Sequence, residues 1–219
     1  MSIQSNLLEI KSSLPPHVTL VAVSKTKPVP DLMEAYNAGQ RIFGENKIQE
    51  MAGKQEEMPK DIEWHMIGHV QTNKVKYMGA FVSLVHGVDS LKLLAEINKQ
   101  AKKNDRVINC LLQMHIAEEE TKFGMDENEL NELLASDEFK AMENIKVTGL
   151  MGMATFTEDE NQIKKEFTHL KTIFDGLSGL SIVNCQLSTL SMGMSGDYTI
   201  AIDCGSTMVR IGSSIFGSR

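Results

Sequence analysis

The chain has 219 residues, of which 42% are hydrophobic and 23% are charged, an ordinary composition for a globular protein with a sizeable core. The formal net charge of -7 argues against a nucleic-acid partner, and no apolar run approaches the ~20 residues that span a membrane. The amino-terminal segment contains no secretory signal, and Cys110, Cys185 and Cys204 are not in CxxC spacing, so we expect free thiols, no metal site and a cytoplasmic location.

The first half of the chain alternates helices with short apolar strands. Apolar side chains at Ile3, Leu7, Ile10 and Leu14 predict a helix over residues 2–14, which two prolines end. The β-branched run that follows predicts the first strand. The elements expected here, in chain order, are the strand at 19–23, a helix at 30–39, a strand at 41–43, a strand at 63–68, a helix at 71–79, a strand at 84–89 and a helix at 90–103.

The second half continues the alternation. A β-prone run predicts a strand at 106–116, and Asp126 and Glu129 have capping-box spacing at the start of a helix over 126–136. A strand at 146–153 precedes a long helix that begins at Thr157 and includes Phe174. The last expected elements are a strand at 181–191, a helix at 196–205 and a strand at 207–212.

Eight strands that alternate with helices predict an α/β protein, a single (β/α)8 TIM barrel with an extra N-terminal helix. At about 27 residues per unit, the chain lies near the lower size limit of such barrels. Few residues remain for a second domain, so we expect one domain over residues 1–219. A doubly wound open sheet is the competing arrangement, but no GxGxxG motif follows the first strand.

Glycine and serine follow the last two predicted strands. The segments are SMGMSGD at residues 191–197 and RIGSSIFG at residues 210–217. The loops after strands seven and eight of such a barrel are its usual phosphate site, and glycine lets backbone N–H groups approach an anion closely. The two segments together therefore predict one phosphate site.

Two lysines, Lys25 and Lys27, follow the first predicted strand in VTLVAVSKTKP. If the pleat of the strand continues, both point to the same face. A lysine that is partly desolvated beside another cation can present a neutral amine, which forms an imine with a carbonyl group. Combined with a phosphate site, this chemistry leaves two candidates: a Schiff-base aldolase that acts on a sugar phosphate, and a protein that binds pyridoxal 5'-phosphate.

Seven ordered segments resemble the pyridoxal phosphate homeostasis protein family, from about Val18 to Gly217. The segments are AVSKTKP, FGENKIQE, EWHMIGHVQTNK, TKFGM, GLMGM, LSMGMSGD and GSTMVRIGSSIFG. The resemblance implies a barrel like the N-terminal domain of alanine racemase, with pyridoxal 5'-phosphate held as a Schiff base on Lys25. The other cofactor-binding positions that it implies are Asn46, His65, Met153, Ser191, Gly193, Ser195, Arg210, Gly212 and Ser213.

The resemblance also implies that the protein maintains the cofactor pool and has no robust catalysis of its own. Arg210 matches the residue beside the pyridine nitrogen, and a guanidinium can only donate, so that nitrogen stays unprotonated and the ring is a poorer electron sink. The second base of alanine racemase is a tyrosine of a further domain, and Tyr36, Tyr77 and Tyr198 have no such context. A small amino-acid racemase is the alternative.

Several positions remain secondary at this stage. Lys27 and Lys122 are candidates to assist transfer of the cofactor to enzymes that use it, which are the expected protein partners. His69 and His115 depart from the family pattern, where proline and asparagine are expected; we interpret His69 as part of a helix entry and His115 as a packing or hydrogen-bonding residue. The acidic composition, without a long exposed apolar segment, predicts a monomer.

Overall fold

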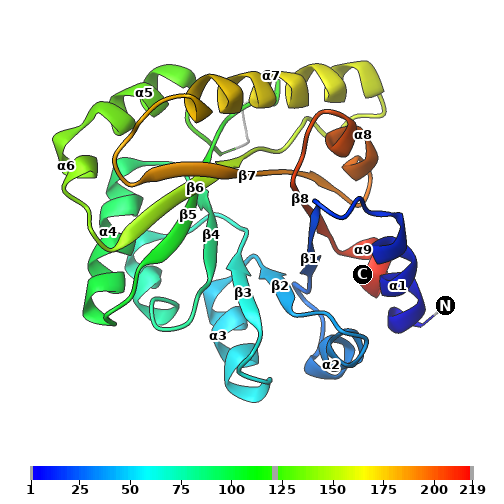
Figure 1. Ribbon diagram of the computed structural model, residues 1–219. Helices are drawn as coiled ribbons and strands as arrows, with labels where there is room; N and C mark the ends of the chain where they lie inside the picture. Colours follow the sequence, from blue (N-terminus) through cyan, green and yellow to red (C-terminus); the bar gives the residue numbers. More distant parts are fainter. Residues whose placement is uncertain (1, 120–122, 218–219) are drawn as a thin grey trace.

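The chain forms a closed barrel of eight parallel strands with helices outside it (Figure 1). The computed structural model describes residues 2–119 and 123–217. The strands are β1 Thr19–Val23, β2 Ile42–Glu45, β3 Glu63–Met66, β4 Leu84–Val88, β5 Ile108–Gln113, β6 Ile145–Met151, β7 Cys185–Met194 and β8 Met208–Ile211. Each pairs with the next along the chain, and β8 closes the barrel on β1. The predicted barrel is therefore confirmed.

The helices connect successive strands and cover the outside of the barrel. They are α1 Ile3–Ser13, α2 Val29–Asn37, α3 Ile48–Glu57, the 3-10 helix η1 Thr72–Tyr77, α4 Leu91–Lys103, α5 Glu127–Ala135, α6 Asp137–Lys140, α7 Glu160–Ser178, α8 Tyr198–Asp203 and α9 Ser213–Phe216. Asp126 and Glu129 form the predicted capping box at the start of α5, with both reciprocal hydrogen bonds present. Side-chain capping therefore fixes this boundary as the sequence indicates.

Several elements differ from the sequence-based expectation. The expected helix at 71–79 is the shorter η1, and α3, α6 and α9 were not predicted at all. The long helix α7 begins at Glu160 rather than Thr157, because Asp159 accepts hydrogen bonds from the backbone N–H groups of its first turn. Strand β7 extends to Met194, so Ser191 and Gly193 lie within a strand rather than in a loop.

The hydrophobic core has two layers. The larger layer lies between the barrel and the helices and contains the bulkiest fully buried side chains, Trp64, Phe43, Phe139 and Phe167. The smaller layer fills the barrel interior and consists of Val21, Leu84, Leu111, Met151 and Met208. Each fully buried large apolar side chain contributes about 1.5–3 kcal/mol, so the outer layer supplies most of the stabilisation.

Strands β6 and β7 approach unusually closely where their register shifts near Gly149. A Cβ atom at this position would lie 1.7 Å from the carbonyl oxygen of Thr189. Only glycine fits between the two backbones without a shift of one strand.

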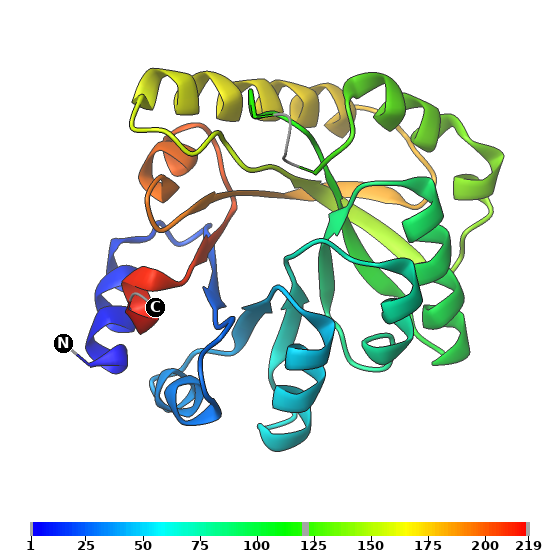
Figure 2. The same ribbon diagram turned by 180° about the vertical axis from the view of Figure 1, so that it is seen from behind.

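The two ends of the chain meet on one side of the barrel (Figure 2). Helix α1 packs against α9, and Asn6 Nδ2 donates a hydrogen bond to the carbonyl oxygen of Ile215 at 3.1 Å. This contact holds the carboxyl-terminal helix next to the end of β8.

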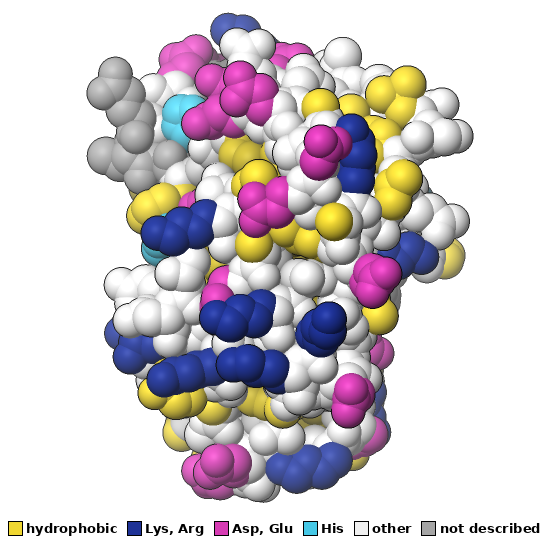
Figure 3. Space-filling view, turned by 90° about the vertical axis from the view of Figure 1, so that its left-hand side faces the viewer, with side chains coloured by type: hydrophobic (Ala, Val, Ile, Leu, Met, Phe, Trp, Pro, Cys, Tyr) yellow, Lys and Arg dark blue, Asp and Glu magenta, His cyan; other side chains and the backbone are white. Residues whose placement is uncertain are grey.

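Charge is unevenly distributed on the side that carries α4, α5 and α6. Figure 3 shows acidic side chains gathered near the top of this side and basic ones across its lower half, with apolar side chains between them. Among the described residues, no helix has both the length and the apolar character required to cross a membrane.

Candidate functional site

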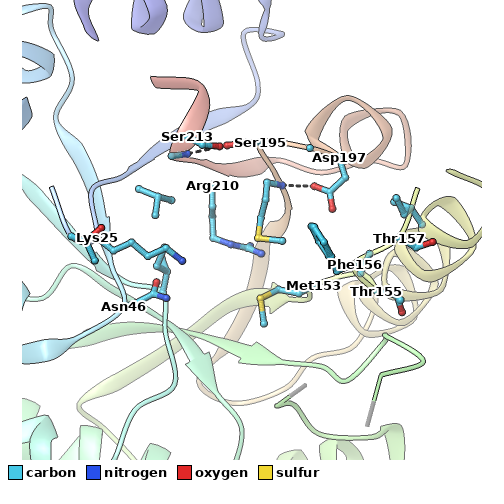
Figure 4. A pocket seen from close by; sticks show the side chains of 18 of the residues that line it. Lys25, Asn46, Met153, Thr155, Phe156, Thr157, Ser195, Asp197, Arg210 and Ser213 are labelled. Carbon is cyan, nitrogen blue, oxygen red and sulfur yellow. Dashed lines mark hydrogen bonds between the residues drawn. The ribbon is translucent and has the colours of Figure 1, made fainter. Parts of the chain in front are cut away.

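A cavity of about 430 Å³ opens at the carboxyl ends of the strands. Figure 4 shows Lys25 and Asn46 at one end of the cavity and Thr155, Phe156 and Thr157 toward the other, with Arg210 between them. This volume lies in the range of pockets for small organic ligands, and the location is where barrels of this kind hold their ligands.

A tight turn after β1 carries Lys25 into the pocket. The backbone N–H of Lys27 donates to the carbonyl oxygen of Ser24 at 3.1 Å, and Thr26 has a φ of 64°. The strand pleat therefore ends before Lys25, so the condition under which both lysines would point to the same face is not met. Lys27 lies at the rim, where its Nζ donates to the carbonyl oxygen of Phe216 at 2.9 Å.

The loops after β7 and β8 form the opposite wall and are joined by a hydrogen bond. The backbone N–H of Gly212 donates to Ser195 Oγ at 3.2 Å (Figure 4). A Cβ atom at residue 212 would lie 3.1 Å from the carbonyl oxygen of Val23, so glycine permits β8 to approach β1 here. Ser195, Gly212 and Ser213 all line the pocket, which brings the two predicted phosphate-binding segments together.

Arg210 projects from β8 into the floor of the pocket and is only 3% exposed. Its guanidinium donates to Ser191 Oγ at 2.6 Å, to the Ser191 carbonyl oxygen at 2.9 Å and to the Gly152 carbonyl oxygen at 3.1 Å. Burial lowers the pKa of Arg210 to about 10, which still leaves the guanidinium charged at neutral pH. The pocket therefore has a fixed, positively charged donor at its centre.

A chain of buried polar side chains continues from Arg210 through the barrel. His86 Nδ1 lies 3.1 Å from Ser191 Oγ, and His86 Nε2 lies 3.1 Å from His65 Nδ1. Arg210 can only donate, so Ser191 Oγ accepts from it. The contacts between Ser191 and His86 and between His86 and His65 continue this chain into the barrel, with donor and acceptor roles that depend on the tautomers of the two rings.

Both histidines are held neutral. Burial lowers the pKa of His65 to about 3, and burial, reinforced by His65 and Arg210, holds the pKa of His86 well below its ordinary value. The only permanent charge in this chain of four side chains is therefore that of Arg210.

The structure brings together most of the predicted cofactor-binding residues. Those that line the cavity are Lys25, Asn46, Met153, Ser195, Arg210, Gly212 and Ser213. His65 and Ser191 are not in the lining; Ser191 contacts Arg210 directly, and His65 is linked to Ser191 through His86. Gly193 is not in the lining either; it has a φ of 98°, and a Cβ atom there would lie 2.7 Å from Ala201 Cβ in α8.

The loop after β6 contributes pocket residues that the sequence did not reveal. Thr155, Phe156 and Thr157 line the cavity, and Phe156 is 93% exposed. Buried Glu166 of α7 accepts from the backbone N–H of Thr155 and from Thr155 Oγ1, both at 2.7 Å. The sequence did contain a signal for these pocket residues: Thr155, Phe156 and Thr157 come shortly after the strand predicted at 146–153. It was missed because a helix was expected to begin at Thr157.

His69 and His115 are not among the residues that line this cavity. His69 lies in the segment that enters η1, whose N-cap is Gln71; its ring pairs with Asp89 at 3.2 Å and stacks on Phe123 with ring centroids 4.1 Å apart. His115 hydrogen-bonds to the carbonyl oxygen of Glu119 at 3.0 Å, as its interpreted hydrogen-bonding role requires. Lys122 lies outside the described residues.

The fold and the cavity define a (β/α)8 barrel protein with a small-molecule pocket at the carboxyl ends of its strands. Residues 1–219 match the family described as alanine racemase, N-terminal domain. The alanine racemase of Clostridium difficile in complex with cycloserine shares this fold, with a TM-score of 0.78 at 16% identity; the match covers 100% of this chain and 60% of that one.

Two other proteins are much closer in sequence. The chain is 36% identical over 234 residues to the pyridoxal phosphate homeostasis protein of Pasteurella multocida, covering 100% of this chain and 98% of that protein. PipY of Synechococcus elongatus, solved without PLP, has a TM-score of 0.92 at 33% identity, covering 99% of this chain and 100% of that one. PipY with PLP bound has a TM-score of 0.89. The chain belongs to the pyridoxal phosphate homeostasis protein family, which confirms the resemblance found in its sequence.

Proposed function

We propose that this protein binds pyridoxal 5'-phosphate through Lys25 and maintains the pool of free cofactor, without robust catalysis of its own. The observation that carries the proposal is that one cavity holds all three features. Lys25 lies on one wall, the Ser195–Gly212 contact lies on the opposite wall, and Arg210 lies between them. The PLP bound to PipY and the names of the relatives support the same ligand.

The residues of the cavity fit the functional groups of this cofactor. The Lys25 amine suits the aldehyde: Nζ adds to the carbonyl carbon, a C=N bond forms, and the carbonyl oxygen leaves as water. The hydroxyls of Ser195 and Ser213, beside Gly212, suit the phosphate. Asn46 and Met153 border the remaining space between the two walls.

Arg210 supports binding without strong catalysis. The cofactor supplies an electron sink, and the strength of that sink depends on protonation of the pyridine nitrogen. Arg210 has no proton acceptor and stays charged, so it would keep a nitrogen that faces it unprotonated. Its hydrogen bonds to Ser191 and Gly152 hold it in this orientation.

The described lining of the cavity also supports a binding role because it contains no tyrosine or histidine. Tyr36 hydrogen-bonds to Asp61 at 2.8 Å away from the cavity, and Tyr77 is 50% exposed on η1. Two-sided proton transfer at an amino-acid α-carbon needs a second base opposite Lys25. The carboxylate in the described lining is Asp197, whose Oδ1 accepts a hydrogen bond from the backbone N–H of Met194 at 2.5 Å and is thereby tied to the loop after β7.

Borohydride reduction tests the binding proposal. The wild-type chain is incubated with pyridoxal 5'-phosphate and reduced, and the intact mass is measured. We expect one added cofactor per chain, loss of this adduct in Lys25→Ala, and no loss in Lys92→Ala, which removes an exposed lysine of α4. Absence of a Lys25-dependent adduct in the wild type would overturn the proposal, and an adduct with a keto sugar phosphate instead would favour the aldolase.

A second measurement tests the non-catalytic part. The loaded protein is mixed with each of the twenty amino acids in deuterium oxide, and exchange at the α-carbon is followed by NMR. We expect no exchange above that caused by the free cofactor. Rapid exchange with one amino acid would instead identify the racemase alternative.

The proposal extends to how the protein works in the cell. We infer that residues 1–219 act as one cytoplasmic, monomeric cofactor-binding domain that hands the cofactor to enzymes that use it. The three free cysteines support a reducing compartment. Sedimentation of the loaded protein tests the monomer, and activation of a cofactor-free aminotransferase by the loaded protein tests the transfer.

A further inference from the structure

The turn that carries Lys25 adopts a conformation that its sequence disfavours. Ser24 and Lys27 are joined by a backbone hydrogen bond, and Thr26, at the third position of the turn, has a φ of 64°. A β-branched residue is rarely found in this left-handed region, where glycine is the usual choice. Such strain persists only where surrounding contacts hold the backbone in place.

Helix α3 supplies those contacts. Glu50 Oε1 accepts a hydrogen bond from the backbone N–H of Thr26 at 2.6 Å. Lys54, one helical turn later, donates to Glu50 Oε1 at 2.7 Å and to the carbonyl oxygen of Ser24 at 2.8 Å. One side chain of α3 therefore holds the N–H at the strained residue, and a second holds the carbonyl group at the start of the turn.

Glu45, at the end of β2, holds Lys54 from the other side. Its Oε1 accepts from Lys54 Nζ at 2.7 Å and from Ser24 Oγ at 2.6 Å. Lys54 thus uses all three of its N–H donors, on Ser24, Glu45 and Glu50. Its ammonium is fixed rather than solvated, and the residue is 7% exposed.

This arrangement is costly for the folded protein. Glu45 is fully buried, and its Oε2 has no hydrogen-bond partner in the described part of the chain. Burial raises the pKa of Glu45. Charged groups buried in this way are expensive unless fully paired, so a fold that retains them beside a ligand pocket has a reason other than stability.

We propose that Glu50 and Lys54, backed by Glu45, are positioning residues that hold the Lys25 turn ready to bind the cofactor aldehyde. The inference rests on the proposed function. Asn46 follows Glu45 directly and lies beside Lys25 in Figure 4. The unit acts through the backbone of the turn and touches no ligand.

The test compares Glu50→Ala with three other variants. Glu50→Ala removes the acceptor for Thr26, whereas Glu50→Gln keeps an oxygen there. Glu57→Ala is the matched control, because it removes an exposed carboxylate from the same helix. Adding Thr26→Gly to Glu50→Ala supplies a residue that adopts the left-handed conformation without strain.

The readout is the apparent affinity and rate of formation of the reducible lysine adduct. We expect Glu50→Ala to weaken the affinity about fivefold or more, since the strain of one such residue corresponds to at least that factor. Glu50→Gln and the double variant are expected to stay within about threefold of the wild type, and Glu57→Ala to match it. Rescue by Thr26→Gly would attribute the loss to the backbone conformation of residue 26, and urea unfolding of the same variants shows how much of it reflects general stability.

A ligand-free measurement keeps this test independent of the proposed function. Hydrogen exchange of the Thr26 amide, followed by NMR, is expected to be at least tenfold faster in Glu50→Ala than in the wild type and Glu57→Ala. If the wild type forms the adduct but Glu50→Ala forms it equally well, the inference is wrong and the proposed function stands. If the wild type forms no adduct, the proposed function fails, and so does the role inferred for this unit toward a cofactor. If exchange of the Thr26 amide is the same in Glu50→Ala and the wild type, the hydrogen bond from Thr26 to Glu50 does not hold the turn.

Discussion

Mild acid is expected to destabilise the protein through the two histidines beneath the pocket. Both rings are buried and neutral, and burial lowers the pKa of His65 to about 3. In the unfolded chain each ring takes up a proton near the ordinary pKa of about 6.5. Because the folded-state pKa values are depressed, this contribution to stability is complete above that pH and is lost as the pH falls toward 3.

The size of the stability loss follows from how far the pKa of each histidine is lowered in the folded protein. Each proton bound only by the unfolded chain changes the free energy of unfolding by about 1.4 kcal/mol per pH unit, so His65 accounts for about 2 kcal/mol between pH 7.5 and pH 5. His86 is also fully buried, with its pKa held well below the ordinary value, and adds a loss in the same direction. Together the two rings remove up to about 4 kcal/mol over this interval.

Urea unfolding at a series of pH values measures the difference between variants. In His65→Gln, the loss of stability between pH 7.5 and pH 5 is expected to be about 2 kcal/mol smaller than in the wild type, whatever the absolute stability of the variant. His17→Gln, at an exposed position of the surface, serves as the control. Equal pH dependence in His65→Gln and the wild type would refute the view that His65 is buried as a neutral ring.

Two further predictions concern the barrel and the anion wall. Gly149→Ala is expected to lower the free energy of unfolding by about 3 kcal/mol, because its Cβ would meet the carbonyl oxygen of Thr189. Gly53→Ala, on the exposed face of α3, is expected to raise the free energy of unfolding by about 0.5–1 kcal/mol. Urea unfolding measures both changes, and equal effects would contradict the packing argument. Ser195→Ala is expected to weaken binding of pyridoxal 5'-phosphate about tenfold but to leave binding of pyridoxal, which has no phosphate, nearly unchanged. Titration of the visible absorbance with both ligands checks this, and an equal loss for both would remove Ser195 from the phosphate wall.

Hydrophobic period and capping residues were sufficient to predict the barrel. Asp126 and Glu129 located the start of α5 because their spacing reports a local hydrogen-bonding pattern. Helix α3 was missed because its sequence, IQEMAGKQEE, is mostly polar, contains Gly53 and has no side-chain cap at Lys47. Its apolar contacts with the barrel are few, so the periodic signal was weak.

Some residues of the candidate site could be predicted from the sequence, and others could not. Lys25, Ser195 and Arg210 follow or end strands, and the barrel topology alone brings such residues to one rim. Glu45 and Lys54 could not be identified from the sequence, because charged residues are normally solvated and nothing local indicates that these two are buried together. Their environment depends on contacts between β1, β2 and α3, which only the folded chain supplies.

The position of the pocket over the junction of β1 and β8 has a mechanical consequence. These strands are nearly two hundred residues apart in the chain, and the barrel can open there without separating any consecutive pair of strands. A ligand bonded to Lys25 after β1 and held by Ser213 after β8 would link these two strands, much as a disulfide restricts the two segments that it joins. We therefore expect the occupied barrel to resist opening between β1 and β8 more than the empty one does.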